Sequence, residues 1–320
     1  MRGLTILIML FSLSVTFGQG IYAPPARTAG TTAMHKDSAA FLAWGDSCLV
    51  TRGYVKTDDK SMGLATSGTT ANVIGVSNGS TMSLGDSGVA IFVLSHPIFD
   101  GTGADFAVFE NGFSATFLEL AFVEVSSDGI NYFRFPAYSD TQDTTQVGSF
   151  GSLDATYLHN LAGKYQATYG TPFDLADVPT NALLNKANIT HIKIVDVIGN
   201  ISSAYASYDS QNNKVNDPWP TAFASSGFDL DALGLINLAS LAGIDENEKI
   251  AISVYPNPVS DYLTIQTNYP IESIQVMDLY GKVVTFNKSR KIDLSRLAAG
   301  VYFVKIGIKN QTYVRKVVKK

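Results

Sequence analysis

Short runs of hydrophobic residues, each bounded by turn-forming residues, recur along most of the chain. They are rich in Val, Ile, Phe and Tyr, and none keeps the 3.6-residue period of an amphipathic helix over a long stretch. We expect a strand at each of six runs: VAIFVLSHPIF (89–99), DFAVFENGF (105–113), LELAFVEVS (118–126), INYFRFPAY (130–138), HIKIVDVIG (191–199) and FDLDALGLI (228–236).

Several of these runs are nearly continuous in hydrophobic residues, as strands buried between two sheets are. Ser127, Asp128 and Gly129 separate the third run from the fourth. An Asp-Gly pair between two hydrophobic runs favours a hairpin, because glycine adopts a positive φ at little cost. Many short strands and 27 glycines predict an all-β fold, a jelly-roll-like β-sandwich.

Two long polar segments interrupt this rhythm, at 139–188 and at 208–227. The first is long for a connection inside a compact domain, and we expect a short helical turn in it near Ala176–Asn185. Loops on a rigid scaffold commonly carry function. These two segments are therefore where we expect a binding site.

Charge divides the chain in two. Residues 1–243 hold 11 Lys and Arg against 21 Asp and Glu, whereas residues 244–320 hold 12 against 7. The change of sign predicts a cargo domain at 20–243, an acidic linker at 244–251 and a second domain at 252–320. An acidic cargo domain argues against nucleic acid as a partner. We interpret the basic residues near position 320 as the polar face of an edge strand.

The first 19 residues have the three-part pattern of a secretory signal peptide. Arg2 precedes an apolar run from Leu4 to Val15, and cleavage is expected near Gly18 and Gln19. The run is too short to span a bilayer comfortably, and no later stretch is long enough, so we expect an exported chain without a transmembrane segment. A single cysteine, Cys48, allows no internal disulfide.

Beyond residue 252 the pattern restarts as short alternating strands joined by tight turns, which predicts a small Ig-like β-sandwich. Pro256 and Pro258 fix φ and lack a backbone donor, so they confine their segment to an edge or a kink. Gly281 suits a hairpin turn, and Gly300 suits a tight turn that leads into the next strand.

The same stretch contains VYPNPVSDYLTI, IQVMDLYGKVV and IDLSRLAAGVYFVKI in this order. It closely resembles the C-terminal (type A) sorting domain of Bacteroidota proteins exported by the type IX secretion system. The residues that carry the resemblance are Tyr255, Pro256, Asn257, Pro258, Gly281 and Gly300. The resemblance implies recognition by the type IX secretion machinery and a mature protein that is secreted or attached to the outer-membrane surface. The alternative is an ordinary Ig-like accessory domain.

The cargo domain also has a family likeness. SLGDSGVAIFVLSHPIFDGTGADFAVFENGF and ELAFVEVSSDGINYFRFP, with FDLDALGLIN near the end, resemble a family of bacterial cell-surface proteins of unassigned role. The SSDG hairpin and the FDLDALG strand are similar to galactose-binding-type jelly rolls, a fold common among carbohydrate-binding modules. Carbohydrate binding is what this second resemblance implies, by analogy of fold.

The carboxylates offer weak support for catalysis. Glycoside hydrolysis needs two carboxylates that face each other across the substrate. Glu119 and Glu124 are expected on opposite faces of one strand, and Glu110 is expected to cap the turn at Asn111 and Gly112. No serine lies in a G-x-S-x-G motif, and no HExxH zinc motif is present. We therefore predict that the protein is not an enzyme.

Calcium is the one cofactor that the sequence brings into consideration, because it binds carboxylate and carbonyl oxygens in loops. DGTGAD supplies Asp100 and Asp105, and Asp229 and Asp231 lie in the last predicted strand of the cargo domain. The alternative is that these aspartates cap turns.

Aromatic and polar residues in or beside the two long segments suggest a sugar site, since rings stack on sugar faces while amides and carboxylates bind hydroxyls. The candidates are Tyr165, Tyr169, Asn216, Asp217 and Trp219. The alternative is that the rings hold the loops against the sandwich. The leading hypothesis is a non-catalytic glycan-binding protein at the cell surface or secreted. The alternatives are an adhesive or structural surface protein that binds protein or matrix, and a glycan hydrolase.

Overall fold

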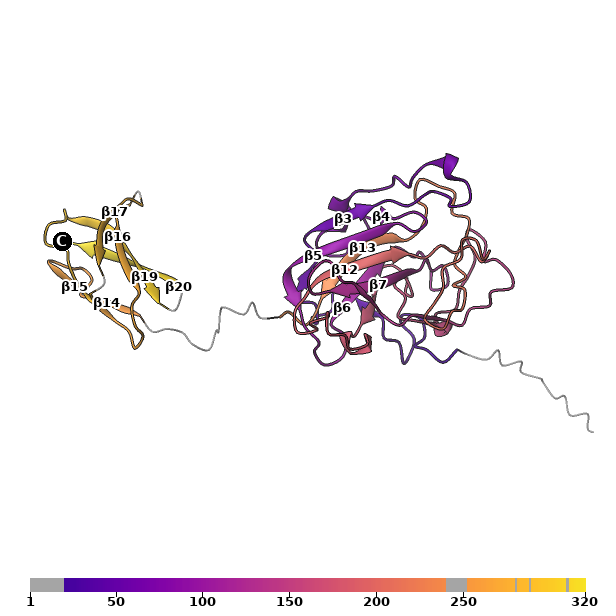
Figure 1. Cartoon of the computed structure of the whole chain (residues 1–320), viewed down its shortest axis with the longest axis horizontal. Coiled ribbons are helices and arrows are strands. Elements are labelled where there is room, and N and C mark those ends of the chain that lie inside the picture. Colours follow the sequence, from indigo (N-terminus) through magenta and orange to yellow (C-terminus); the bar gives the residue numbers. More distant parts are fainter. Residues whose placement is uncertain (1–19, 240–251, 280, 288, 309–310) are drawn as a thin grey trace, which may run out of the picture. The chain divides into compact units, whose positions relative to one another are not determined.

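The computed structural model describes residues 20–239, 252–279, 281–287, 289–308 and 311–320 (Figure 1). The predicted signal peptide and linker lie outside these residues. The chain divides into two compact units, Met1–Leu241 and Ala242–Lys320. Helical structure in the described part is limited to four short 3-10 turns, η1 (Lys60–Met62), η2 (Thr70–Val73), η3 (Ala155–Tyr157) and η4 (Leu175–Asp177). No described helix has the length and apolar character needed to cross a membrane.

The N-terminal unit is a sandwich of two antiparallel sheets, as the hydrophobic runs predicted. The first sheet has the order β1-β11-β6-β13-β2, and β4 also pairs with β13. Its strands are β1 (Met34–His35), β2 (Ala43–Trp44), β4 (Met82–Ser83), β6 (Phe106–Glu110), β11 (Tyr169–Phe173) and β13 (Asp229–Leu235).

The second sheet has the order β3-β5-β12-β7-β8. Its strands are β3 (Cys48–Thr51), β5 (Val89–Ile98), β7 (Ala121–Ser126), β8 (Phe133–Arg134) and β12 (Ile189–Asp196). A separate ribbon joins β9 (Tyr138–Ser139) to β10 (Leu158–His159).

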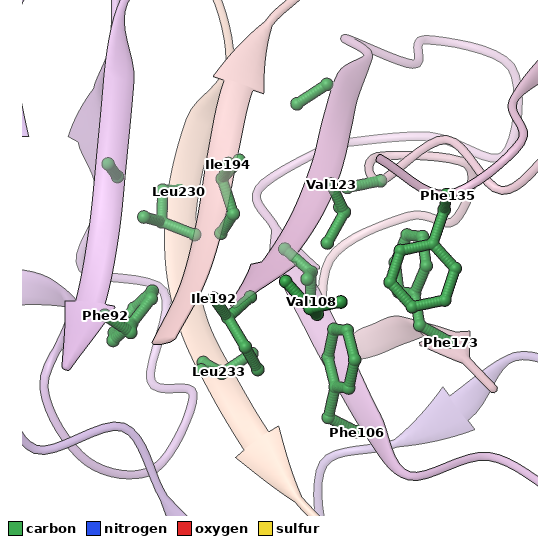
Figure 2. Packing of buried hydrophobic residues seen from close by; sticks show 14 of the residues in the cluster. Phe92, Phe106, Val108, Val123, Phe135, Phe173, Ile192, Ile194, Leu230 and Leu233 are labelled. Carbon is green, nitrogen blue, oxygen red and sulfur yellow. The ribbon is translucent and has the colours of Figure 1, made fainter. Parts of the chain in front are cut away.

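The hydrophobic core lies between the two sheets. Figure 2 shows Ile192, Ile194 and Val123 of the second sheet with Leu230 and Leu233 of the first, and all five are buried. A group of rings closes one side of this core, where Phe106 stacks on Phe173 at 5.3 Å between ring centres and meets Phe135 edge-on at 5.8 Å. Burial of these side chains supplies most of the driving force for folding of this unit.

The six predicted strands are present, with one correction. The run 130–138 is not one strand, because β8 ends at Arg134 and β9, which begins at Tyr138, pairs with β10 in a separate ribbon. Pro136 lies in this gap and has no N–H to donate to a ladder. The predicted helical turn is the shorter η4. The predicted hairpin joins β7 to β8, and Asp128 Oδ1 accepts the N–H groups of Ile130 and Asn131, each at 2.8 Å.

The strand directions bring distant acidic residues to one end of the sandwich. β6 ends at Glu110 where β13 begins, since Glu110 pairs with Leu230. β7 begins where β12 ends, since Ala121 pairs with Asp196. Glu110, Asp196 and Asp229 therefore share one end, and Glu119 precedes β7 at the same end. We call this the Glu110 end.

The C-terminal unit is a second, smaller β-sandwich. One sheet has the order β14 (Ser253–Tyr255), β15 (Tyr262–Gln266), β18 (Lys291–Asp293). The other has the order β17 (Val283–Asn287), β16 (Ser273–Met277), β19 (Gly300–Ile308), β20 (Gln311–Lys319). Leu263, Val276 and Val304 are among the buried residues between them. The basic β20 lies at a sheet edge, as the sequence predicted.

The proline segment follows β14, which is itself an edge strand. The Tyr255–Pro256 and Asn257–Pro258 peptide bonds are cis. The Asn257 side chain donates to the carbonyl of Lys316 at 2.9 Å and accepts from the N–H of Val318 at 2.8 Å. These two hydrogen bonds attach the segment to β20.

The two predicted turn glycines of this unit differ in conformation. Gly281 lies between β16 and β17 with φ of 78°, the left-handed region that glycine adopts most readily. Gly300 has no positive φ and is the first residue of β19, where it pairs with Lys319.

Candidate functional site

A pocket of about 140 Å³ opens at the Glu110 end of the N-terminal unit. Four segments that are distant in sequence contribute to it: the β6–β7 connection, both long polar loops and the start of β13. The lining residues are Glu110, Asn111, Phe113, Phe117, Glu119, Ser149, Phe150, Thr221, Phe223, Ser225 and Asp229. Both loops that the sequence singled out therefore take part in one site.

Four phenylalanines line one part of the pocket. Phe113 and Phe117 stack with ring centres 4.2 Å apart, Phe150 lies 6.2 Å from Phe117, and Phe223 lies 6.0 Å from Phe150. Phe113 is 72% exposed, Phe150 is 70% exposed and Phe223 is 49% exposed. Exposed aromatic rings beside a pocket offer flat apolar faces to a ligand, at the cost of leaving apolar surface in water.

Glu110 is a buried carboxylate whose position is set by a tight turn. Its Oε2 accepts the N–H of Gly112 at 2.7 Å, so the predicted capping role is confirmed. A Cβ on Gly112 would lie 2.9 Å from this oxygen and 2.9 Å from the carbonyl oxygen of Phe117. Glycine at 112 therefore allows the carboxylate and the following turn to pack together.

Glu119 differs from Glu110 because its carboxylate has no hydrogen-bond partner among the described residues. It is only 7% exposed, and it lines the pocket. Burial raises the pKa of Glu119 well above its ordinary value, and the nearby Asp229 raises it further. A carboxylate that is mostly buried and has no donor in the protein is costly, and a ligand in the pocket could supply one.

The carboxylates of the pocket act on one another. Burial raises the pKa of Glu110 well above its ordinary value, with Glu119 and Asp229 adding to the effect. Burial also raises the pKa of Asp229, although a hydrogen bond from Ser83 and the charge of Arg52 oppose this. Each carboxyl is therefore held toward its neutral form while the pocket contains no positive charge.

More acidic groups lie behind the pocket. Asp217 Oδ2 accepts the N–H of Leu120 at 3.3 Å, whereas its buried Oδ1 has no partner. Burial raises the pKa of Asp217 well above its ordinary value, and so do Glu119 and Asp196. Asp196 accepts the N–H groups of Phe228 and Ser87, at 2.7 and 2.9 Å. The Glu110 end thus concentrates acidic groups.

The tyrosines that the sequence proposed for sugar binding are not in the pocket lining. Tyr165 is buried, and its hydroxyl lies 2.8 Å from that of Thr32. Tyr169 is half-buried in β11, its hydroxyl accepts from Arg27 at 3.1 Å, and its ring meets His35 edge-on. Both rings hold the N-terminal segment against the sandwich.

Asn216 and Trp219 also serve the packing of the loops. The Asn216 amide donates to the carbonyls of Gln142 and Thr145, and its oxygen accepts the N–H of Val147 at 2.9 Å. Trp219 is half-buried, and its Nε1 donates to Asp86 at 3.3 Å. Of the five proposed residues, Asp217 alone acts electrostatically on the pocket, through Glu119 and Glu110.

The aspartates considered for calcium fall into two groups. Asp100 and Asp105 lie with Asp174 at the end of the sandwich opposite Glu110, and one carboxylate oxygen from each lies within 4.8 Å of the others. Asp105 already accepts the N–H groups of Gly101 and Leu175, at 2.8 and 2.7 Å.

The other two aspartates lie in β13 and do not join the first pair. Asp229 accepts from Ser83 and lines the pocket. Asp231 accepts from Ser77 at 2.6 Å and from the N–H of Asn78 at 3.2 Å, and so shapes a turn. The four predicted residues therefore do not form one site.

The sequence prediction missed the phenylalanines of the pocket. Phe113, Phe150 and Phe223 each lie among small and polar residues, in ENGFSA, VGSFGS and PTAFASS. A large ring that no hydrophobic neighbour accompanies, inside a loop, is a signal of exposure. This signal is present in the sequence, whereas the predicted sugar site rests on tyrosines and a tryptophan.

Residues 253–320 match the family described as a secretion system C-terminal sorting domain. The C-terminal unit is a type IX sorting domain. It therefore interacts with the type IX secretion machinery, and the protein is secreted or attached to the cell surface.

Other comparisons contribute little. No curated protein matches the chain. Among solved structures, the β-glucuronidase of Ruminococcus gnavus in complex with uronic deoxynojirimycin is 12% identical, with a TM-score of 0.22 over 86% of this chain and 44% of that enzyme. The same enzyme with uronic isofagomine gives 12% identity and a TM-score of 0.18 over 73% and 35%. The chain spans less than half of these enzymes, and TM-scores this low say nothing about function.

Proposed function

We propose that the N-terminal unit is a non-catalytic glycan-binding module that the sorting domain carries to the cell surface or the medium. The observation that supports this most is the combination of stacked, exposed phenylalanines with hydrogen-bond acceptors in one pocket. Phe113 and Phe150 offer flat faces to the C–H groups of a sugar ring, and Glu119 has free acceptor oxygens for hydroxyl groups.

The carboxylates support binding rather than hydrolysis. A glycosidase keeps one carboxyl protonated as the acid and holds the other ionised as base or nucleophile. Here burial raises the pKa of both Glu110 and Glu119, and no described Lys, Arg or His lines the pocket to keep either one ionised. The hydrolase remains the second candidate, because two glutamates do line the same pocket.

A glycan array probed with the full-length chain tests this function. We expect bound glycans, and we expect Phe113→Ala to weaken binding at least tenfold, because aromatic stacking contributes about 1 to 3 kcal/mol in many sites. Phe99→Ala is the matched control, since Phe99 is partly exposed next to the end of β5, away from the pocket.

Two results would redirect the assignment. A folded protein that binds no glycan would favour an adhesive role, in which the exposed rings contact protein or matrix. Turnover of a polysaccharide that Glu110→Gln abolishes would establish the hydrolase instead.

A further inference from the structure

The lining of the pocket is unbalanced in charge. Glu110, Glu119 and Asp229 are three of its eleven residues, and no Lys, Arg or His is among them. Asp217 adds a fourth carboxyl behind Glu119, with one oxygen that has no partner. Arg52 is the cation that acts on Asp229, but its guanidinium is occupied by the carbonyls of Ser67 and Gly68, at 2.9 and 2.7 Å.

A neutral sugar would not correct this imbalance. Its hydroxyls donate hydrogen bonds to carboxylates, yet they bring no charge to offset several buried acids. A uronic acid or a sulfated sugar would add negative charge to a site where burial and neighbouring acids already disfavour it. A protonated amine supplies both the donors and the charge, and hydrogen bonds between charged partners are the stronger ones.

The aromatic side of the pocket agrees with a cationic ligand. The faces of Phe113, Phe117 and Phe150 carry the negative part of the ring quadrupole, which attracts an ammonium group within about 6 Å. The same rings stack against the apolar face of a sugar. A volume of about 140 Å³ corresponds to roughly five water molecules, which suits a single terminal unit rather than a long segment of chain.

A metal ion fits this pocket less well. In the described part of the chain, Asp100, Asp105 and Asp174 place their oxygens close enough together for one ion, whereas the carboxylates of the pocket do not converge in this way. Acidic groups that are spread around a pocket, beside aromatic rings, suit an organic cation better than a metal ion, which needs several oxygens close together.

We infer that the ligand of this pocket is an amino sugar with a free amine, whose ammonium group pairs with Glu119 while its ring stacks on the phenylalanines. The inference rests on the proposed glycan-binding function and names the class of glycan. Glu119 is the key residue because it is nine-tenths buried, lines the pocket and has no other partner among the described residues.

The test compares oligomers of glucosamine with N-acetylglucosamine oligomers of the same length, by calorimetric titration of the full-length protein at pH 7 and about 0.15 M salt. We expect the free amine to bind at least tenfold more tightly, and Glu119→Gln to abolish the preference. Glu124→Gln is the matched control, because Glu124 pairs with Arg134 and Lys193 outside the pocket. An unfolding transition like that of the native chain verifies that each variant folds.

The outcomes separate the two proposals. Equal affinity for both oligomers would overturn the amine inference and leave glycan binding intact. Butylammonium that binds through Glu119, with no glycan bound, would support the charge argument and refute glycan binding. The inference would be overturned if neither type of oligomer nor butylammonium bound. It would also be overturned if no amine bound and the pocket instead bound Ca²⁺ in a way that Glu119→Gln abolished.

Discussion

The Glu110 carboxylate accepts a hydrogen bond of 2.7 Å from the N–H of Gly112, two residues further along the chain. This contact turns the chain sharply after β6. Glu110 is a buried acid in the pocket lining, and Phe113, which follows the turn, is 72% exposed. One local hydrogen bond therefore positions both the acidic part and the aromatic part of the site.

Gly112→Ala tests the importance of this turn. The new Cβ would lie 2.9 Å from both Glu110 Oε2 and the carbonyl oxygen of Phe117, so the turn must shift. We expect a loss of about 1 to 3 kcal/mol in the free energy of unfolding, typical of overpacking, together with weaker ligand binding. Urea unfolding measures the first effect and titration the second.

Gly148→Ala is the control for that substitution, because a Cβ at Gly148 meets nothing within 4 Å. If the two alanine variants unfold at the same urea concentration, the tight packing around Gly112 is not a constraint on this fold.

The stability of the N-terminal unit should depend on pH through its buried acids. Burial raises the pKa of Asp217 well above its ordinary value of 3.8. Between those two values the folded chain retains a proton that the unfolded chain has released, so the free energy of unfolding decreases as pH rises. Glu110, Glu119 and Asp196 contribute in the same direction.

Asp217→Asn removes one of these groups. We expect the variant to be more stable than the native chain by about 1 to 3 kcal/mol at pH 8, because an unpaired buried oxygen no longer has to be charged, and by less at pH 4. Urea unfolding at the two pH values measures the difference.

Asp128→Asn should have the opposite effect to Asp217→Asn, because it lowers the free energy of unfolding at neutral pH and has less effect at low pH. Hydrogen bonds from Asn131 and Ile130 lower the pKa of Asp128, so its contribution is present above its ordinary pKa and is lost as pH falls. If the stability of Asp217→Asn depends on pH as that of the native chain does, the Asp217 carboxyl is not the source of the decrease in stability at high pH.

Much of the architecture could be predicted from local sequence, and the site could not. Val, Ile and Phe in runs such as 89–99 specify strands through their own preference and burial. Asp128 with Gly129 specifies a hairpin in the same local way. The pocket instead depends on Glu110 and Asp229 of the first sheet and on Glu119, which lies just before β7 of the second. Only the pairing of β6 with β13, and of β7 with β12, brings them to one end.

The calcium prediction shows the same limit. The sequence indicates Asp100 and Asp105 as a pair, because only a short glycine-containing loop separates them. It does not indicate Asp174, since that residue caps η4 in a different loop and reaches the pair only through the fold. Likewise, nothing local distinguishes Asn216, whose amide is consumed by loop carbonyls, from an amide that binds a ligand.

Calcium binding stays a prediction, and its location can now be tested. We expect saturating Ca²⁺, compared with chelator, to raise the melting temperature of the N-terminal unit. At 100 times Kd the gain is about 2.7 kcal/mol, or roughly 5 to 10 °C. Asp174→Asn should abolish the shift, and Asp229→Asn should preserve it. If only Asp229→Asn abolishes the shift, calcium binds in the pocket instead. If Ca²⁺ does not shift the melting temperature of the native chain, the calcium prediction is wrong.

Asn257→Ala tests how the sorting domain closes. Its side chain makes two hydrogen bonds with β20: it donates to the carbonyl of Lys316 and accepts the N–H of Val318. Loss of both should destabilise the C-terminal unit by about 1 to 3 kcal/mol. Faster hydrogen exchange at the N–H of Val318 reports this loss, and a smaller exported fraction of the protein should accompany it. The exposed Asn268, changed to alanine, is the control. Unchanged exchange at Val318 would contradict the assigned role of Asn257.

The attachment of the proline segment to β20 also orders events in time. β20 pairs with β19 and holds Asn257, and it is synthesised after every other strand described in this chain. A chain without residues 311–320 would therefore leave the proline segment without its two hydrogen bonds and β19 without its partner at the sheet edge. The first and the last segments of this unit thus close it together, and only after β20 has been made.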